Sequence, residues 1–270
     1  MANTGGTAGR CADARVTRPG GVRVRCRDVA RSTQQESVGD RFVTEPYLEL
    51  PEGARPPRAA VLVLHGGKAM SRAVVDAGQL TVRRMQPFVR DLAALGHDLA
   101  VAQLRYRVRG WNGTGEDVLA DVAFALAALD ARYGGVPTVL VGHSMGGRAA
   151  LRSAGHPTVR GVVALAPWLP GTEPVEQLAG RDVAVLHGTR DRTTSPRASA
   201  QFVTRAVPLA RRAVCLHVPW SGHGMLSRAS TWHRLTAAFV AAIADDAPFE
   251  RPLELARAAG CRDVTGEVTP

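Results

Sequence analysis

Apolar residues gather into short runs that recur along the chain from residue 59 onward. Six such runs occupy residues 59–65, 98–104, 138–143, 161–167, 182–188 and 213–218. Several runs are apolar at consecutive rather than alternate positions, which is typical of strands covered on both faces of a parallel sheet. The pattern therefore predicts six buried strands.

Helix-compatible stretches lie between these runs. They cover residues 79–95, 115–132, 145–154 and 196–206, and a fifth stretch, 227–245, follows the last run. Three of them end before Gly96, Gly134 and Gly155, and glycine directly after a helix is a common stop signal. The alternation predicts an α/β fold: a doubly wound, mostly parallel sheet with helices on both faces.

The two ends of the chain do not follow this rhythm. Residues 1–36 are polar and glycine-rich, with one alternating stretch at 22–27 that predicts a strand with a basic face. Residues 41–50 predict a strand or a hairpin arm. We expect an N-terminal extension at 1–36, one domain at 37–245 and a loose C-terminal tail at 246–270.

Composition adds bounds on size and partners. The 270 residues are 45% hydrophobic, which is ample for a packed core. The net charge of +10 comes almost wholly from arginine, because Lys68 is the only lysine. Most arginines are interleaved with Asp and Glu, but residues 10–31 hold seven arginines against two aspartates. For that segment we favour a solvated extension over an anion-binding arm, and we expect no nucleic-acid partner.

Cysteine usage and hydropathy bear on the compartment. The four cysteines, Cys11, Cys26, Cys215 and Cys261, show no close pairing, which is more typical of reduced thiols than of a disulfide framework or a metal site. No segment approaches the roughly 18 consecutive apolar residues of a membrane span, and the first ten residues lack the apolar core of a signal peptide. We expect a cytoplasmic protein without a membrane span.

The most informative chemical pattern, GHSMGG at 142–147, follows the third run. In G-x-S-x-G between a strand and a helix, a strained turn lifts the serine hydroxyl above the sheet. Ser144 also begins a helix, whose N-terminal amides favour a developing anion. The pattern predicts Ser144 as a nucleophile.

A serine hydroxyl is a poor nucleophile until a base takes its proton. In the chain order that accompanies this turn, an acid and then a histidine follow the serine. His223 lies between glycines in the loop after the last run, which leaves room for its ring to turn towards the serine. His187 and His217 lie in predicted strands and are interpreted as structural, and His233 lies in a predicted helix. His223 is the candidate base.

Asp191 is the candidate acid, because it follows the fifth run and ligands bind at the carboxyl ends of parallel strands. Asp182 begins the same strand and would emerge at the opposite end of the sheet. Glu173 lies several residues beyond the fourth run. The alternative role of Asp191 is a helix cap or a surface ion pair with Arg190 or Arg192.

An oxyanion hole needs two backbone N–H groups. The first is expected from Met145, the residue after the serine. The second is expected from the loop after the first run, where HGG occupies 65–67. We assign Gly67, with Lys68 as the alternative.

Together these motifs carry a family resemblance. On HGG at 65–67, GHSMGG at 142–147, Asp191 and SGHG at 221–224, the chain resembles a serine hydrolase of the α/β-hydrolase fold over about residues 40–245. The GHSMGG form is similar to that of small esterases, monoacylglycerol-type lipases and dienelactone-hydrolase-like proteins. Dienelactone hydrolases proper carry cysteine and haloalkane dehalogenases carry aspartate at the position of Ser144, which disfavours both activities. The resemblance implies hydrolysis through an acyl-enzyme on Ser144, with no cofactor or metal.

The same resemblance bears on the substrate. Many members of the fold insert a cap domain between the sixth and seventh strands of the full sheet, whereas the corresponding link here, 167–181, has only 15 residues. We therefore expect an open site and a small acyl ester as substrate. Trp168, Leu169 and Trp220 are candidate pocket walls, with ordinary packing as the alternative. Lys68 is a candidate contact for an anionic substrate group, with a solvated side chain as the alternative.

Three functions follow from this site. A carboxylic-ester hydrolase is favoured by the serine turn, the order of the three groups and the short link. A thioesterase or a peptidase would use the same groups. A non-catalytic binding protein of this fold would normally have lost one of them.

Overall fold

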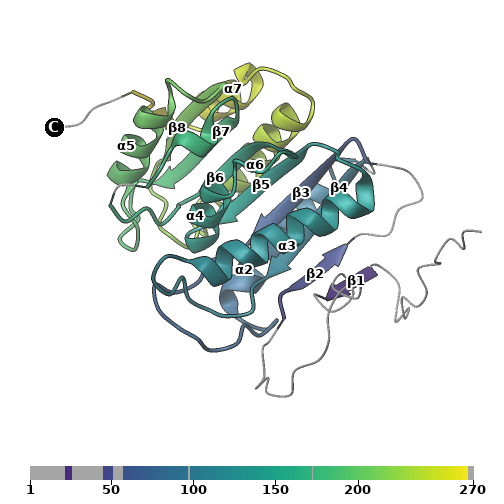
Figure 1. Ribbon diagram of the computed structural model, residues 1–270. Coiled ribbons are helices and arrows are strands. Elements are labelled where there is room, and N and C mark those ends of the chain that lie inside the picture. Colours follow the sequence, from purple (N-terminus) through teal and green to yellow (C-terminus); the bar gives the residue numbers. More distant parts are fainter. Residues whose placement is uncertain (1–21, 26–44, 51–56, 97, 172, 267–270) are drawn as a thin grey trace, which may run out of the picture.

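The computed structural model describes residues 22–25, 45–50, 57–96, 98–171 and 173–266, and of residues 22–25 only the backbone. Within these residues the strands are β1 (Val22–Arg25), β2 (Tyr47–Leu50), β3 (Ala59–Leu64), β4 (Leu99–Arg105), β5 (Thr138–His143), β6 (Val159–Leu165), β7 (Asp182–Gly188), β8 (Arg212–Val218) and β9 (Arg262–Asp263). They form one nine-stranded sheet in the order β1-β2-β4-β3-β5-β6-β7-β8-β9. Strands β3 to β8 run parallel, and β1, β2 and β9 are antiparallel additions at the two sides (Figure 1).

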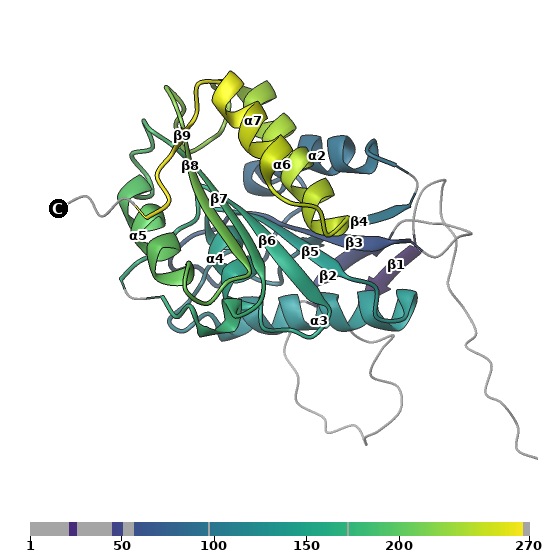
Figure 2. The same cartoon turned by 90° about the horizontal axis from the view of Figure 1, so that it is seen from above.

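Helices cover both faces of the sheet. They are α2 (Leu80–Ala93), α3 (Glu116–Tyr133), α4 (Met145–Arg152), α5 (Pro196–Ala206), α6 (Ala229–Ala244) and α7 (Glu250–Ala258), with a short 3₁₀ helix, η1 (Glu176–Leu178). Figure 2 shows α2, α6 and α7 on one side of the sheet and α3, α4 and α5 on the other. The predicted doubly wound α/β fold is confirmed.

Two apolar clusters, one on each face, hold these layers together. Every residue of β3, β5 and β7 is buried, as expected for strands covered on both sides. Because side chains alternate along a strand, Leu62 packs on the side of α3 and Val61 and Val63 on the side of α2 and α6. Helix α2 meets them with Met85 and Phe88, which lie about one turn apart on its buried face.

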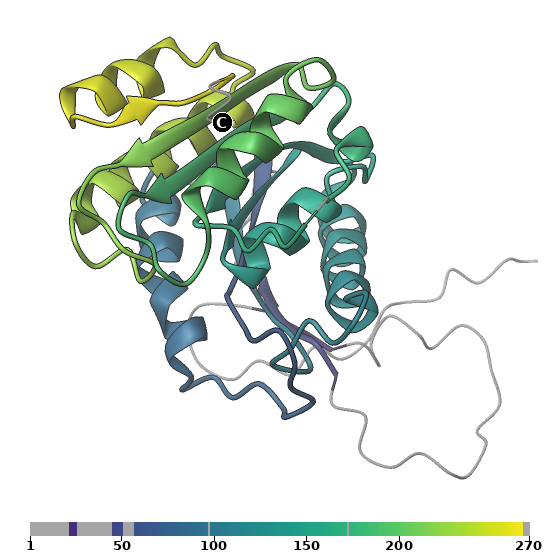
Figure 3. The same ribbon diagram turned by 90° about the vertical axis from the view of Figure 1, so that its left-hand side faces the viewer.

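The C-terminal segment differs from its prediction. Residues 246–270 were expected to form a loose tail, but they include α7 and β9. Helix α7 contacts α6 through residues such as Ala256, and β9 pairs antiparallel with β8 through Leu216↔Asp263 and His217↔Arg262 (Figure 3). The segment was misread because its apolar positions are few, so its order depends on packing against the domain rather than on its own pattern.

At the other end, the strand predicted at 22–27 is present as β1, whose backbone pairs with β2 through Val22↔Leu50. The remainder of the extension predicted at 1–36, including most of the arginine-rich segment 10–31, lies outside the described residues. So do Cys11 and Cys26. Cys215 is a buried core residue of β8, as its position in an apolar run predicts. No helix in the described part of the chain has the length and apolarity needed to cross a bilayer.

The connection between β6 and β7 is short. Its described residues contain only one turn of 3₁₀ helix, η1, and no inserted domain. Over the described residues of this connection, no large cap is present, as expected.

Candidate active site

Ser144 lies on the sharp turn between β5 and α4. Its backbone has φ +56° and ψ −117°, a conformation that residues with a side chain rarely adopt. Hydrogen bonds to the neighbouring strand hold it there: the Ser144 N–H donates to Leu165 O at 3.0 Å, and Ser144 O accepts from the Trp168 N–H at 3.0 Å. The strain at Ser144 is therefore maintained by β6 and the loop that follows it.

Two glycines make this turn sterically feasible. A Cβ added to Gly142 would lie 2.2 Å from Gly146 O, and one added to Gly146 would lie 2.5 Å from Leu64 O. Both contacts are with backbone, which cannot move aside without breaking the sheet. The glycines predicted around Ser144 thus allow α4 to start directly against β3 and β5.

Three side chains from the ends of three strands meet at this turn. His223 Nε2 lies 3.0 Å from Ser144 Oγ, and His223 Nδ1 lies 2.8 Å from Asp191 Oδ2. The Asp191 side chain is fully buried, whereas 20% of the His223 side chain is exposed. The structure thus brings together the three residues that the sequence predicts, in hydrogen-bonding order.

The Asp191 carboxylate is held by several donors. The N–H groups of Thr193 and Thr194 donate to Oδ1 at 2.8 and 2.9 Å, and the Thr194 hydroxyl donates to Oδ2 at 2.9 Å. Burial alone would raise the pKa of this carboxyl, but hydrogen bonds from His187, His223 and the two amides outweigh it. The pKa of Asp191 is therefore held well below its usual range, and the group is ionised at neutral pH.

The loop that carries His223 is tied down from two sides. His143 Nε2 lies 2.9 Å from His223 O, so His143 donates to that carbonyl. From α2, Arg84 donates to Gly224 O and, at 2.7 Å, to Met225 O. These bonds fix the backbone at His223 and over the two residues that follow it.

His143 stays neutral in this position. Burial, followed by the nearby His223, lowers the pKa of His143 to about 3. The ring of His143 also lies against that of His223, with 4.8 Å between centroids. A neutral imidazole supplies a donor without adding a charge that would compete for the Asp191 carboxylate.

The loop after β3 has a fixed peptide orientation. The Tyr106 N–H donates to His65 Nε2 at 3.3 Å, so the His65 proton is on Nδ1, which donates to Gly66 O at 2.7 Å. Burial lowers the pKa of His65 to about 4, which keeps this arrangement neutral. Because a trans peptide points its C=O and N–H in opposite directions, holding the Gly66 carbonyl also aims the Gly67 N–H.

This loop lies directly against the serine turn. A Cβ at Gly66 would be 3.4 Å from Ser144 Cβ, and one at Gly67 would be 2.5 Å from Met145 Cε. The Lys68 N–H already donates to Arg109 O at 2.8 Å. Of the two candidates for the second oxyanion-hole N–H, the Lys68 amide is thus already engaged by Arg109, whereas the Gly67 amide has no bond to Arg109.

The four candidate pocket residues have different surroundings. Trp168 is half-buried and packs edge-on to Trp111 at 6.4 Å between centroids, while Leu169 belongs to the apolar core on the α3 face. Trp220 is 63% exposed and is covered on one side by the Arg190 guanidinium at 4.4 Å. Lys68 is exposed. Trp168 is the one whose own backbone bonds to Ser144.

Glu173, the other acid considered from the sequence, is engaged elsewhere. Its buried carboxylate forms ion pairs with Arg148 at 2.5 Å and Arg152 at 3.5 Å. The Arg148 guanidinium also lies over the rings of Trp111 and Trp168, at 4.0 and 4.8 Å from their centroids. This group braces the wall next to Ser144 and leaves Asp191 as the acid that faces His223.

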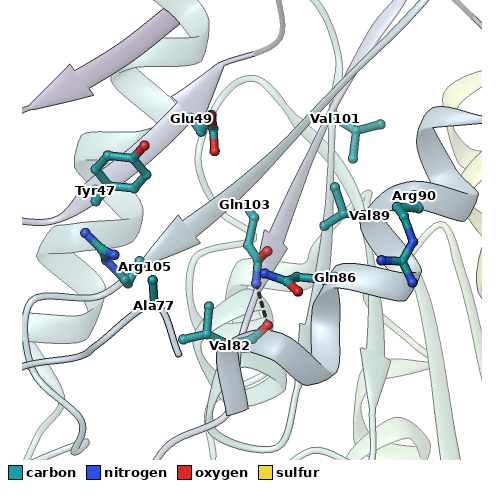
Figure 4. Close-up of a pocket in the computed structure, with 10 residues that line it drawn as sticks. All are labelled: Tyr47, Glu49, Ala77, Val82, Gln86, Val89, Arg90, Val101, Gln103 and Arg105. Carbon is teal, nitrogen blue, oxygen red and sulfur yellow. Dashed lines mark hydrogen bonds between the residues drawn. The ribbon is translucent and has the colours of Figure 1, made fainter. Parts of the chain in front are cut away.

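A separate cavity of about 430 Å³ lies on the sheet face beside α2 (Figure 4). Its lining comes from β2, β4, α2 and Ala77, and includes Tyr47, Arg105 and Gln103 but none of the three residues at the serine turn. Gln103 is already bonded to Val82 O at 3.0 Å, and Arg105 stacks on Tyr47 at 4.5 Å. The cavity thus lies outside the arrangement around Ser144. Among the described residues, no group of three or more His, Cys, Asp or Glu side chains is placed to hold a metal ion.

Sequence reasoning did not find several residues that hold this site. His187 was interpreted as structural, and His143, Thr194 and Arg84 were not considered. A usable signal exists for the two histidines, because both lie at the carboxyl ends of their strands, the edge where the site is expected. Nothing in the sequence pattern indicates the role of Arg84, which depends on how α2 meets the last loop.

Comparison with known proteins agrees with this architecture. The family model of the serine aminopeptidases, S33, matches residues 55–184. Among solved structures, an α/β serine hydrolase without lid from Xanthomonas campestris has 15% identity and a TM-score of 0.54, covering 90% of this chain and 97% of its own. A search of curated proteins gave no significant match.

Two further structures give similar values. The monoacylglycerol lipase of Paleococcus ferrophilus has 15% identity and a TM-score of 0.56, covering 74% of this chain and 99% of its own. Est1E from Butyrivibrio proteoclasticus has 13% identity and a TM-score of 0.57, covering 76% of this chain and 96% of its own. At such identities the likeness establishes the fold alone, and that fold is the α/β-hydrolase fold.

Proposed function

For this α/β-hydrolase-fold protein we propose the hydrolysis of carboxylic esters through an acyl-enzyme on Ser144. The observation that carries the proposal is the pair of contacts at His223, 3.0 Å to Ser144 Oγ and 2.8 Å to Asp191 Oδ2. A serine hydroxyl within hydrogen-bonding reach of a base, itself oriented by a third group, is the arrangement that activates a nucleophile.

The reaction has two halves. Ser144 Oγ attacks the ester carbonyl carbon while its proton passes to His223 Nε2, and the negative oxygen accepts hydrogen bonds from the N–H groups of Gly67 and Met145. His223 then gives the proton to the departing alkoxide, which leaves as an alcohol. Water repeats the sequence on the acyl-enzyme and releases the acid.

Asp191 serves this cycle through charge and orientation. Its carboxylate stays ionised, because hydrogen bonds hold its pKa below the usual range. It therefore stabilises the imidazolium that forms on His223 without taking the proton itself. The acid, the base and the nucleophile then act as one unit.

The short β6–β7 connection supports a small, solvent-accessible acyl ester as substrate. Of the neighbours that share the fold, the monoacylglycerol lipase points to the same bond type by its name. A thioester substrate would use the same groups. The cytoplasmic location expected from the cysteines stays a prediction.

A peptidase is the second candidate, because the matching family model is that of the serine aminopeptidases. An aminopeptidase has to hold the cationic α-amino group of its substrate, which needs an uncommitted carboxylate near the nucleophile. The buried carboxylates of Glu173 and Asp121 are paired with Arg148 and Arg107. This pairing leaves neither of these two carboxylates free for that role.

The test is intact mass after incubation with a fluorophosphonate, beside the Ser144→Ala and His223→Ala variants. We expect one adduct on the wild type and none on either variant. A panel of esters, thioesters and aminoacyl anilides then ranks the substrate classes. A folded wild type that forms no adduct would overturn the proposal.

A further inference from the structure

Asp191 has a second histidine partner besides His223. His187 Nε2 lies 3.2 Å from Asp191 Oδ2, the same oxygen that His223 Nδ1 contacts at 2.8 Å. His187 is the last residue but one of β7, and its side chain is fully buried. One carboxylate oxygen thus lies between two imidazoles that come from different strand ends.

The proton on His187 can be placed from its contacts. An ionised carboxylate only accepts hydrogen bonds, so the His187 nitrogen that faces Asp191 carries the proton. The other nitrogen, Nδ1, lies 2.8 Å from Ser199 Oγ and then accepts from that hydroxyl. Ser199 is fully buried on α5, and its hydroxyl, which can donate as well as accept, fits this placement of the proton.

We propose that His187 is a positioning residue for the reaction on Ser144. Through the proton on Nε2 it donates to Asp191, holds the carboxylate in the rotamer that faces His223, and draws off part of its negative charge. The effect of His187 on catalysis rests on the proposed function. The tautomer and the hydrogen bond to Asp191 stand independently of it.

Thr194 shares this arrangement. Its hydroxyl lies 2.9 Å from Asp191 Oδ2 and 3.2 Å from both His187 Nε2 and His223 Nδ1. A hydroxyl has one proton to give, so it cannot replace His187 while also serving the carbonyl of Ala166 at 3.3 Å. His187 is thus the donor whose loss the remaining groups cannot fully compensate.

The titratable and charged groups that face the site determine in which direction the pH profile moves when His187 is replaced. His187 approaches from β7 and His143 from β5, while Arg84 on α2 acts at the loop of His223. Without the His187 donor, the Asp191 charge is less dispersed and stabilises protonated His223 more strongly. The base then keeps its proton to higher pH, and the acid limb of the activity profile moves upward.

The experiment compares His187→Leu with His187→Gln. Leucine fills the space without a donor, whereas the glutamine amide places an N–H near the position of Nε2. For His187→Leu we expect kcat on a p-nitrophenyl ester to fall about tenfold with KM nearly unchanged, as for one lost hydrogen bond. The acid limb should move up by about half a pH unit. His187→Gln should retain the wild-type profile and most of the rate.

A matched control is His156→Leu. His156 also contacts a hydroxyl, Thr158 Oγ1 at 3.0 Å, but it precedes β6 at the opposite edge of the sheet. Its replacement should leave the pH profile unchanged. If His187→Leu only lowers the unfolding temperature and keeps the wild-type profile, His187 is structural and the proposal is wrong.

A second measurement does not depend on activity or on either variant folding. Correlation of ring ¹⁵N and ¹H signals in the wild type should show His187 neutral with its proton on Nε2. A proton on Nδ1 would overturn the proposal. A wild type without a fluorophosphonate adduct but with this tautomer would overturn the proposed function alone.

Discussion

The two ends of β7 each carry a buried aspartate, and their partners differ in kind. Asp182, at the amino end, accepts from Arg212 at 2.8 and 2.7 Å and also pairs with Arg211. Asp191, just past the carboxyl end, is held by two histidines, a hydroxyl and two amides. Both side chains are fully buried, so burial alone does not set the two carboxylates apart.

The difference lies in whether the partners bring a fixed charge. Arginine is permanently protonated, so the charge of Asp182 is already compensated in the resting protein. The amides and the hydroxyl around Asp191 carry no charge and its histidines can change theirs, which in the proposed mechanism leaves its charge available for an imidazolium that forms during reaction. A buried acid whose partners can change charge is the better indicator of chemistry.

The largest expected effect is that of Asp191→Asn. The amide cannot stabilise the imidazolium and favours the wrong His223 tautomer, so kcat/KM should fall about 10⁴-fold. Steady-state kinetics on a small ester, together with fluorophosphonate labelling rates, measure this. A loss below tenfold would mean that Asp191 is only a cap for its own loop.

Asp182→Asn should lower the stability of the protein and leave its activity nearly unchanged. Removing the carboxylate leaves two arginines without their buried partner, and the free energy of unfolding should fall by about 3–5 kcal/mol. Denaturant titration measures that change, while kcat of the folded protein should stay within twofold. A large fall in kcat with unchanged stability would reverse the comparison between the two ends of β7.

A third buried carboxylate, Asp121, sharpens the comparison. Burial raises its pKa to about 6, although Arg107 donates to it. Because the folded protein then holds this proton more tightly than the unfolded chain, stability should fall as pH rises from about 4 to about 6, by on the order of 2–3 kcal/mol. Unfolding titrations across that range should show the slope in the wild type and not in Asp121→Asn. The control is Asp130→Asn, at an exposed aspartate, which should keep this slope of stability against pH.

The smallest expected effect concerns the backbone of His223. His143→Leu removes the donor to His223 O and should lower kcat about five- to tenfold, the value of one buried hydrogen bond. His143→Gln should restore most of it. Since the pKa of His143 is about 3, neither variant should shift the acid limb above pH 5. Unchanged kcat in His143→Leu would mean that Arg84 alone suffices to hold the loop.

The sequence predicts the parts of this molecule that depend on local pattern. The consecutive apolar runs become β3 to β8, and the positions directly after β5, β7 and β8 bring Ser144, Asp191 and His223 together. The prediction succeeds because parallel strands end at one edge, whatever their exact register.

Contacts between distant elements are harder to predict. His187 was interpreted as structural because it lies in or at the end of a predicted strand, and its contact with Asp191 depends on the turn after Gly188. Helix α7 contains alternating charges and Pro252, so its own sequence does not favour it. It forms because α6 offers an apolar surface, a property that no window of the α7 sequence contains.

The strand β9 has a consequence for how the protein behaves in concentrated solution. Without it, the outer side of β8, whose inner side pairs with β7, would be a template on which another chain can add a strand. Two charged residues, Arg262 and Asp263, occupy part of that edge. The backbone of Cys215 on β8 also donates a hydrogen bond to the Thr265 hydroxyl and accepts one from the Val264 N–H. The short segment from Arg262 to Thr265 thus covers part of this edge and should limit edge-to-edge aggregation.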